Sequence, residues 1–253
     1  MRGLKNKNII VTGGASGIAR AICQRLASEG VNVGIFDIDE AGAKETVKRI
    51  ADEGGNAQSF AVDISDYDQC KQRVGEFESA IGPAHALVNG VGGDKAEPFL
   101  VSKPEIWQKL VAINLYGPIN MCHVTLPGMV ERESGRVVSL SSDAGRVGSS
   151  GEAVYAACKG GIIAFTKTVA RELARKGIVL NVLSPGPTDT PLFQDAMRDA
   201  NPKLGEALIR AIPMRRLGQP EDHAGLATFL CSEEASYITG QVISVSGGLT
   251  MHG

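Results

Sequence analysis

The sequence predicts an α/β fold: a doubly wound, mostly parallel seven-stranded sheet with helices on both faces. Two observations support this prediction. Short runs rich in β-branched residues alternate with amphipathic stretches along all 253 residues, which is the pattern of successive strand–helix–strand units. The strand-like runs are also almost continuously apolar, as expected for parallel strands that are buried on both faces. No repeat, low-complexity tract or linker divides the chain, so residues 1–253 are expected to form a single domain.

The elements follow one another in a regular order along the chain. Strands are expected at residues 8–12, 32–36, 57–62, 86–88, 136–140, 178–183 and 241–245. Amphipathic patterns predict helices near residues 17–29, 40–53, 66–80, 105–132, 153–176 and 220–231. Ile22 and Leu26 lie on the buried stripe of the first helix, and Asp39 stands at the N-cap of the second.

One segment interrupts this order. Residues 184–214 contain five prolines, which are too many for one straight helix. The segment follows a strand, and ligands of open α/β sheets bind at the carboxyl ends of the strands. Its apolar residues provide a side that can pack, which argues against a disordered loop. We therefore expect residues of about 186–214 to form a lid over a bound substrate.

Composition and charge exclude several classes of function. The formal net charge of -2 provides no basic face for nucleic acid and no polybasic segment for a membrane surface. No apolar run reaches the roughly 18 residues that a membrane-spanning helix needs, and the amino terminus lacks a signal-peptide pattern. Five scattered cysteines without a C-x-x-C pair predict free thiols in a reducing, cytoplasmic location. Four dispersed histidines are expected on the surface or in packing, so no metal site is predicted.

A glycine-rich turn follows the first expected strand. It reads Thr-Gly-Gly-Ala-Ser-Gly-Ile-Ala over residues 12–19 and leads into an amphipathic helix. Glycines at such a turn allow the backbone to approach a pyrophosphate, which the N–H groups and dipole of the helix then stabilise. Ordinary tight turns use the same residues, but this position favours a dinucleotide site and hence a Rossmann fold. The candidate cofactor contacts are Gly13, Ser16, Gly17 and Ile18.

The end of the second strand indicates which dinucleotide binds. Asp37 stands about 20 residues beyond the glycine turn, where an acidic side chain accepts hydrogen bonds from the adenosine ribose. A carboxylate at this position repels a 2′-phosphate, and neither Ile38 nor Asp39 is basic. The sequence therefore predicts NAD as the cofactor in preference to NADP.

Further motifs, in matching order over the whole chain, resemble the short-chain dehydrogenase/reductase family. The family's Tyr-x-x-x-Lys pair is matched by Tyr155 and Lys159, its serine by Ser142, and its helix asparagine by Asn114. The resemblance implies that the cofactor also contacts Ile38, Asp63, Ile64, Asn89, Tyr155, Lys159, Pro185, Gly186, Thr188 and Thr190. Two motifs depart from the family pattern, because Ala19 replaces the last glycine of the turn and Asn89-Gly90-Val91-Gly92 replaces Asn-Asn-Ala-Gly.

The resemblance implies an oxidoreductase in which a hydride leaves carbon while a proton leaves the oxygen of a secondary alcohol. Tyr155 is then the base in oxidation and the acid in reduction. Since a free tyrosine has a pKa near 10, a desolvated Lys159 together with the positive nicotinamide ring is expected to lower it. Ser142 is expected to bind the substrate oxygen, Ser141 only to cap the strand end, and Asn114 to place a water beside Lys159.

The likeness is tighter to one branch of the family, the 2-hydroxycyclohexanecarboxyl-CoA dehydrogenases. It implies a cyclic hydroxy acid, or its CoA thioester, as the substrate. Arg146 is the expected partner of a carboxylate or phosphate, although a surface or subunit contact accounts for it equally well. Val147, Leu192, Phe193 and Met197 are expected to enclose a nonpolar ring.

Two alternatives remain open at this point. A 3-oxoacyl thioester reductase of the same family would share these motifs and differ only in its substrate. A non-catalytic dinucleotide-binding subunit would keep the glycine turn without needing the serine, tyrosine, lysine and asparagine. The main prediction is an NAD-dependent alcohol dehydrogenase for a small-molecule alcohol or ketone, and the resemblance implies a homotetramer.

Overall fold

The computed structural model describes residues 1–198 and 202–251. Seven strands form one sheet in the order β3-β2-β1-β4-β5-β6-β7, and each pair of neighbours is parallel. The strands are β1 (Asn8–Thr12), β2 (Asn32–Asp37), β3 (Asn56–Ala61), β4 (Ala86–Asn89), β5 (Gly135–Leu140), β6 (Ile178–Pro185) and β7 (Val242–Val245). The predicted α/β class and doubly wound seven-stranded sheet are confirmed, and the sheet is parallel throughout.

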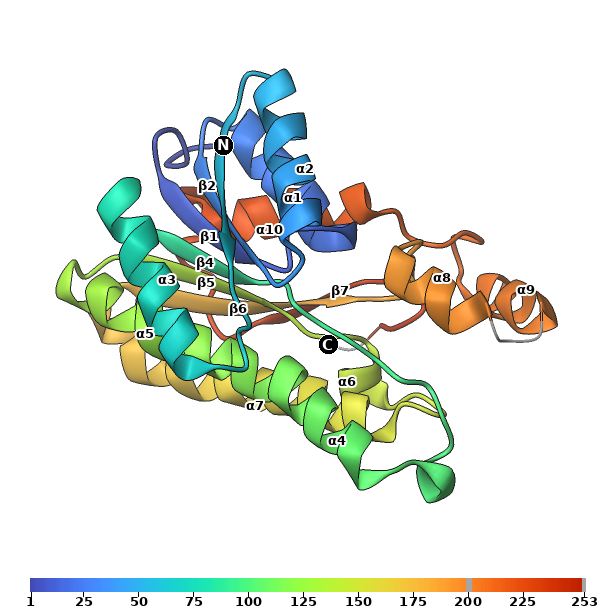
Figure 1. The fold of residues 1–253 in the computed structure, drawn as a ribbon. Coiled ribbons are helices and arrows are strands. Elements are labelled where there is room, and N and C mark those ends of the chain that lie inside the picture. Colours follow the sequence, from blue (N-terminus) through green and yellow to red (C-terminus); the bar gives the residue numbers. More distant parts are fainter. Residues whose placement is uncertain (199–201, 252–253) are drawn as a thin grey trace.

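Helices cover both faces of the sheet (Figure 1). One face carries α1 (Gly17–Ser28), α2 (Glu40–Asp52) and α10 (Pro220–Cys231), and the other carries α3 (Tyr67–Ala80), α5 (Gly117–Glu131) and α7 (Ala153–Leu173). The shorter helices on the right of the picture are α4 (Pro104–Val111), α6 (Ala144–Val147), α8 (Pro191–Arg198) and α9 (Pro202–Ala211). Single 3-10 turns lie at Phe99–Val101, Ala174–Lys176 and Glu233–Ala235.

Alternate strand residues face the two helical layers. Along β1, Ile9 and Val11 belong to the core packed against α1 and α10, whereas Ile10 belongs to the core packed against α3 and α5. Both faces of each central strand are therefore buried. This burial explains why the strand sequences are almost continuously apolar rather than alternating.

The helix expected at residues 105–132 is present and contains a π turn. It consists of α4, a π turn over Ala112–Tyr116, and α5. The Asn114 side chain in the π turn binds both backbone groups of Gly93. Its Oδ1 accepts from the Gly93 N–H at 3.2 Å, and its Nδ2 donates to the Gly93 carbonyl at 2.8 Å. The prediction of a helix over this range is confirmed, because the chain is helical without a gap from Pro104 to Glu131. The π turn within it was not predicted, and such turns are frequent at functional sites.

The proline-rich segment after β6 forms two short helices, α8 and α9, which stand out from the layered body in Figure 1. Pro191 and Pro202 begin these helices, so the predicted interruption by proline is confirmed. The two ends of the segment are joined, because the Gly218 N–H donates to the Pro187 carbonyl at 2.9 Å. Closure of the segment over a substrate stays a prediction.

Two observations concern membranes and metal ions. In residues 1–198 and 202–251, no helix has the length and apolar character needed to cross a membrane. In the same ranges, no three histidine, cysteine or carboxylate side chains gather as ligands for a metal ion.

Candidate active site

The glycine turn between β1 and α1 leaves its backbone open to a ligand. Gly13 and Gly17 have φ angles of 77° and 54°, which glycine adopts without strain. A Cβ on Gly13 would stand 2.9 Å from the Val91 nitrogen, so the close approach to the end of β4 also requires glycine. The side chain of Ser16 makes no capping bond, and the first turn of α1 has no acidic residue. The amino terminus of α1 is therefore suited to a phosphate group.

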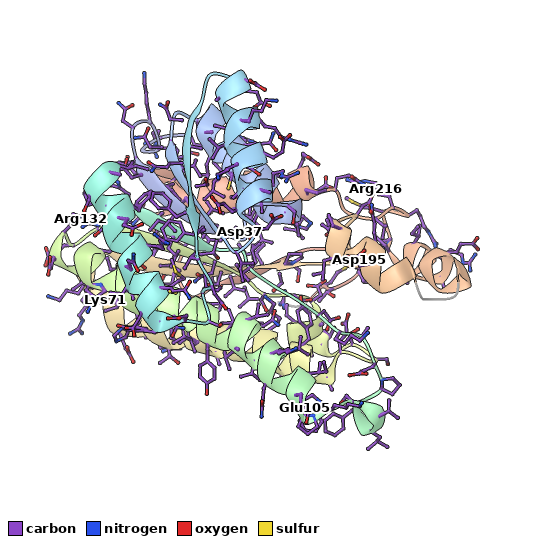
Figure 2. All side chains as sticks on the ribbon, viewed as in Figure 1. Asp37, Lys71, Glu105, Arg132, Asp195 and Arg216 are labelled. Carbon is purple, nitrogen blue, oxygen red and sulfur yellow. The ribbon has the colours of Figure 1, made fainter. Side chains whose placement is uncertain are left out.

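Asp37 lies at the end of β2 and is labelled near the centre of Figure 2. One carboxylate oxygen accepts from the Ala15 N–H of the glycine turn at 2.9 Å, and the other accepts from the Asp39 N–H at 2.9 Å. Each oxygen keeps a further lone pair, so the carboxylate is held in place and can still accept from ribose hydroxyl groups. Asp39 caps α2 by accepting from the Gly42 N–H at 3.0 Å, as predicted, and Ile38 is 73% exposed.

The remaining residues predicted on the adenosine side differ in what they contact. Asp63 follows β3 and accepts bonds from the N–H and hydroxyl of Ser65 at 2.9 and 2.7 Å, while Ile64 is buried. The Asn89 side chain turns toward α5 and β5, with Nδ2 3.5 Å from both the Pro118 carbonyl and the Ser139 hydroxyl. The Asn89 amide nitrogen thus connects β4 to α5 and β5, and the contact of Asn89 with the cofactor stays a prediction.

Ser142 and Tyr155 meet at the carboxyl end of β5. The Ser142 oxygen accepts from the Ala144 N–H at 3.1 Å, and its hydroxyl is hydrogen-bonded to the phenol of Tyr155. Burial raises the pKa of Tyr155 above its ordinary value, the bond to Ser142 opposes this rise, and the charges of Asp94 and Glu152 add to it. The lowered pKa expected of Tyr155 is therefore not produced by the protein alone, which keeps the phenol protonated.

Lys159 lies one helical turn beyond Tyr155 on α7, and only 2% of its surface is exposed. Its Nζ donates to the Leu140 carbonyl at 3.1 Å and stands 5.6 Å from the centre of the Tyr155 ring. Burial lowers the pKa of Lys159 to about 8, so the ammonium form still predominates at neutral pH. A Cβ on Gly92 would lie 3.2 Å from this Nζ and 3.5 Å from Asn114 Oδ1, so both groups border the space that glycine leaves.

The small residues around Ser142 hold these elements together. The Ser141 hydroxyl donates to the Lys159 carbonyl at 2.9 Å, so it joins β5 to α7 rather than only capping the strand. A Cβ on Gly145 would stand 2.7 Å from the carbonyl carbon of Lys159. Glycine therefore allows α6 to lie directly on α7. These contacts set the separation between Ser142 and Tyr155.

The segment after β6 reaches back to the glycine turn. Pro185 ends β6, and the Gly186 N–H donates to the Val245 carbonyl of β7 at 3.0 Å. A Cβ on Gly17 would lie 3.4 Å from the Thr190 methyl carbon, so Thr190 sits against the turn. Thr190, predicted to contact the nicotinamide half, and Gly17, predicted to contact the pyrophosphate, therefore lie side by side in one site.

Comparison with known families agrees with this arrangement. A family model described as enoyl-(acyl carrier protein) reductase matches residues 13–250. The chain belongs to the short-chain dehydrogenase/reductase family. Members of this family are oxidoreductases that use a nicotinamide dinucleotide, so the oxidoreductase class and the type of cofactor are established for the site.

Relatives within the family match almost the whole chain. The 3-oxoacyl-(acyl-carrier-protein) reductase FabG of Chlamydia muridarum is 36% identical over 247 residues, which covers 97% of this chain and 98% of the relative. A 3-oxoacyl-(acyl-carrier protein) reductase with bound NAD from Brucella melitensis has a TM-score of 0.90 and 35% identity, covering 98% of this chain and 92% of that one. An actinorhodin polyketide ketoreductase with NADPH has a TM-score of 0.94 at 29% identity, covering 100% of both chains.

The two departures from the short-chain dehydrogenase/reductase pattern lie against each other. A Cβ on Gly90 would stand 2.8 Å from the Ala19 methyl and 2.5 Å from the Thr12 carbonyl oxygen. The methyl group of Ala19 therefore occupies space that is open because residue 90 is glycine. The Thr12 hydroxyl accepts from the Gly90 N–H at 3.0 Å and ties the end of β4 to the end of β1. The local support that the asparagine motif provides is thus supplied in another way.

His223 contacts a residue predicted to bind the cofactor, and the sequence pattern offers no reason to expect this contact. It lies near the start of α10, is fully buried, and places Nε2 2.8 Å from the Thr188 hydroxyl. We expected the histidines on the surface or in packing. The signal for another role is weak in the sequence, since it consists only of one histidine within an otherwise apolar helical pattern.

Arg146 makes contacts within the chain. Its Nη1 donates to the Ser244 hydroxyl of β7 at 2.7 Å, and that hydroxyl donates to the buried Asp143 carboxylate. These bonds connect the loop after β5 to the last strand of the sheet, whereas the alternative left open for Arg146 was a surface or subunit contact. Its contact with a substrate anion stays a prediction.

The predicted apolar enclosure of the substrate is only partly described. Val147 on α6 and Leu192 on α8 are exposed, and Phe193 is partly buried. The side chain of Met197 lies outside the part of the chain that the structure describes. Val147, Leu192 and Phe193 do not line the cavity beside Tyr155, so their role in enclosing a ring stays a prediction.

A cavity beside Tyr155 contains acidic residues that the sequence analysis did not single out. It lies between the loop after β4 and the start of α7, and its lining includes Asp94, Glu97, Glu152, Phe99 and Trp107. Burial and then the charge of Glu152 raise the pKa of Asp94, and one carboxylate oxygen of Glu97 is buried without a hydrogen-bond partner in the structure. Lys95 lines the same cavity, so three carboxyl groups stand against one ammonium group, and this balance disfavours a substrate carboxylate there.

Proposed function

We propose that this chain is an NAD(H)-dependent reductase that interconverts a ketone and a secondary alcohol on a 3-oxoacyl thioester. The observation that carries the proposal is the junction of the partly buried Ser142 and Tyr155 with the buried Lys159, on the sheet edge that also holds the glycine turn. A non-catalytic dinucleotide-binding subunit would not need these three side chains in contact. The similarity to 3-oxoacyl-(acyl-carrier-protein) reductases supports the substrate class.

The residues present fit a nicotinamide dinucleotide, because the glycine turn is open, the α1 terminus lacks a competing carboxylate, and Asp37 retains free lone pairs. Residues 13–17 would hold the diphosphate and Asp37 the adenosine ribose. Thr188, Thr190 and Lys159 would hold the nicotinamide half. When bound, the nicotinamide supplies or accepts the hydride.

The chain's own residues transfer the proton and stabilise the negative charges that form. Tyr155 donates its phenolic proton to the ketone oxygen in reduction and accepts it back in oxidation. Ser142 donates a hydrogen bond to the same oxygen as negative charge develops on it. The Lys159 ammonium stabilises the phenolate that forms. The space beside Gly92 and Asn114 would hold a water that returns a proton to this phenolate.

The pKa of Tyr155 determines which form of the phenol the reaction starts from. Burial and the neighbouring carboxyl groups raise this pKa, so the phenol of the free protein carries its proton. A protonated phenol is the form that reduction of a ketone requires, whereas oxidation first requires the phenolate.

We assign NAD rather than NADP on the basis of Asp37. Its carboxylate is fixed beside the glycine turn and would repel a 2′-phosphate. Asp37→Ala should weaken NADH binding, because a hydrogen bond to the ribose is lost. It should also reduce the preference for NADH over NADPH, because the repulsion of the 2′-phosphate is lost. The ratio of kcat/KM values for NADH and NADPH measures this, and the exposed Asp52→Ala should leave the ratio unchanged. A wild-type protein that uses both cofactors equally would show the assignment to be wrong.

The charge of the cavity bears on the substrate assignment. A thioester has no carboxylate at the acyl group, so it avoids the repulsion that a free hydroxy acid would meet at Asp94, Glu97 and Glu152, which Lys95 in the same lining offsets only in part. The cyclic hydroxy acid implied by the branch resemblance is the competing substrate. The CoA thioester of this cyclic acid also lacks the carboxylate, so it would not be repelled. The shape of the acyl group must therefore be tested separately from its charge.

An NADH-oxidation assay tests both features of the substrate. The compounds are 3-oxobutyryl-CoA, 2-oxocyclohexanecarboxyl-CoA and free 2-oxocyclohexanecarboxylate. We expect kcat/KM for the linear thioester to exceed that of either cyclic compound by at least about tenfold. A preference for the cyclic thioester would return the assignment to the cyclic branch. Absence of turnover with all three, despite NADH binding, would contradict the proposed reaction.

A further inference from the structure

The hydrogen bonds around His223 assign its tautomer. The Thr188 hydroxyl donates its proton to the Gly186 carbonyl at 2.8 Å. Its oxygen can therefore only accept in the 2.8 Å contact with Nε2 of His223. The neutral imidazole thus carries its proton on Nε2 and donates it to Thr188.

The surroundings of His223 favour this neutral form. Burial lowers the pKa of His223 to about 4, while the charges of Asp222 on the same helix and of Asp143 after β5 oppose the shift. Nδ1 is buried without a partner in the structure. An unpartnered lone pair is far less costly there than an unpartnered N–H group. The imidazole therefore makes one hydrogen bond, and that bond is to Thr188.

Thr188 lies where the two ends of the lid segment meet. The Gly218 N–H donates to the Pro187 carbonyl at 2.9 Å, and the Gly218 carbonyl accepts from the Asp189 N–H at 2.9 Å. A Cβ on Gly218 would stand 3.2 Å from the Thr188 oxygen and 3.4 Å from Nε2 of His223, so glycine leaves the pair its space. Both ends of the segment are thereby tied to each other and, through His223, to α10.

We propose that His223 is a positioning residue for the nicotinamide end of the cofactor. It is fully buried, so it cannot touch a ligand itself and acts by fixing Thr188 and the backbone on either side of it. The inference rests on the proposed function, which places Thr188 at the nicotinamide half. Its specific consequence is that loss of the bond weakens ligands that carry a nicotinamide and spares ligands that lack one.

The test compares the binding of NADH with that of ADP-ribose, which shares the adenosine diphosphate part and lacks the nicotinamide. His223→Leu removes the donor and keeps an apolar side chain. We expect the Kd of NADH to rise roughly threefold to tenfold, the scale of one hydrogen bond. The Kd of ADP-ribose should stay within about twofold of the wild-type value, because its predicted contacts lie at the glycine turn and Asp37.

Four further proteins separate positioning from general damage. His223→Gln keeps an N–H donor at a similar reach and should restore NADH binding. Thr228→Val changes another buried side chain of α10, whose hydroxyl has no partner in the structure, and should leave both ligands unaffected. Thr188→Val removes the hydroxyl that accepts the hydrogen bond from His223. The double variant His223→Leu/Thr188→Val should bind NADH no more weakly than the weaker single variant, because the two residues share one interaction.

The outcomes are distinct. Equal weakening of NADH and ADP-ribose, or no weakening of either, in His223→Leu and Thr188→Val would overturn the positioning role. Failure of His223→Gln to recover NADH binding would also count against it. If the wild-type chain binds ADP-ribose and NADH equally tightly, the segment around Thr188 contributes no binding free energy to the nicotinamide. A wild-type chain that binds neither would overturn the proposed function itself.

Discussion

Burial sets the protonation state of the two residues that the proposed reaction uses. Removal from water disfavours the charged form of each group, which raises the pKa of Tyr155 and lowers the pKa of Lys159 to about 8. Tyr155 therefore begins as a neutral acid beside an ammonium that is still largely charged at neutral pH. This combination suits proton donation to a ketone more directly than proton removal from an alcohol.

At the same scale, His223 makes the folded state sensitive to acid. Its folded pKa of about 4 lies below its ordinary value of 6.5, so the unfolded chain binds this proton more readily. Stability should be complete above about pH 6.5 and fall as the pH decreases toward 4, by up to roughly 3 kcal/mol. Urea unfolding of the wild type and His223→Gln between pH 7.5 and 4.5 measures this loss.

The loss should be smaller in His223→Gln, because glutamine does not titrate. Asp94 changes the stability in the opposite direction, because its pKa is raised in the folded state and the fold loses stability as Asp94 ionises with rising pH. This contribution is the same in the wild type and in His223→Gln. The charges of Asp143 and Asp222 also face the imidazole in the wild type. Parallel stability curves for the two proteins would contradict a neutral, buried His223.

Among the elements, glycines determine how closely strand ends and helices approach. Gly90 meets the Thr12 carbonyl and the Ala19 methyl, so Gly90→Ala should destabilise the protein by about 1–3 kcal/mol through overpacking. Adding Ala19→Gly should recover part of this loss, since the contact with the Thr12 carbonyl remains. Gly75→Ala on α3 is the matched control, because a Cβ there meets nothing within 4 Å. Chemical denaturation measures all four proteins, and equal stability of Gly90→Ala and Gly75→Ala would refute the close packing.

The strands were predictable because their burial leaves a local pattern. Their observed ends differ from the predicted ones by at most two residues, and β1 agrees at both ends. The helix at 105–132 was predictable, but its π turn was not, since the turn goes with the bond between Asn114 and Gly93, which a local pattern does not contain. Local periodicity thus identified the elements but not the π turn that carries Asn114.

The candidate site was predictable to the extent that its residues belong to ordered motifs. The motifs placed Ser142, Tyr155 and Lys159 together, and the structure brings them into contact. The acidic lining at Asp94 and Glu152 depends on two loops that meet only in the fold. His223 likewise depends on the packing of α10 against the segment after β6, so neither feature had a signal in spacing.

For the molecule as a whole, the parallel sheet gathers the site at one edge. The strand order reverses between β1 and β4, which in open α/β sheets marks the crevice where ligands bind. The glycine turn leaves from β1, Ser142 from β5 and Thr188 from β6, so residues far apart in the sequence share one site. The homotetramer implied by the family resemblance stays a prediction.

The central claim is that Tyr155 transfers a proton while the cofactor transfers a hydride. The most direct measurement is turnover of 3-oxobutyryl-CoA with NADH by Tyr155→Phe, together with the Kd of NADH. Since only the titrating hydroxyl is removed, we expect kcat to fall by about 10²-fold or more while the Kd stays within about threefold. Tyr67→Phe, on the surface at α3 and bonded to His123, should retain full activity. Turnover of Tyr155→Phe within about threefold of the wild type would contradict the account.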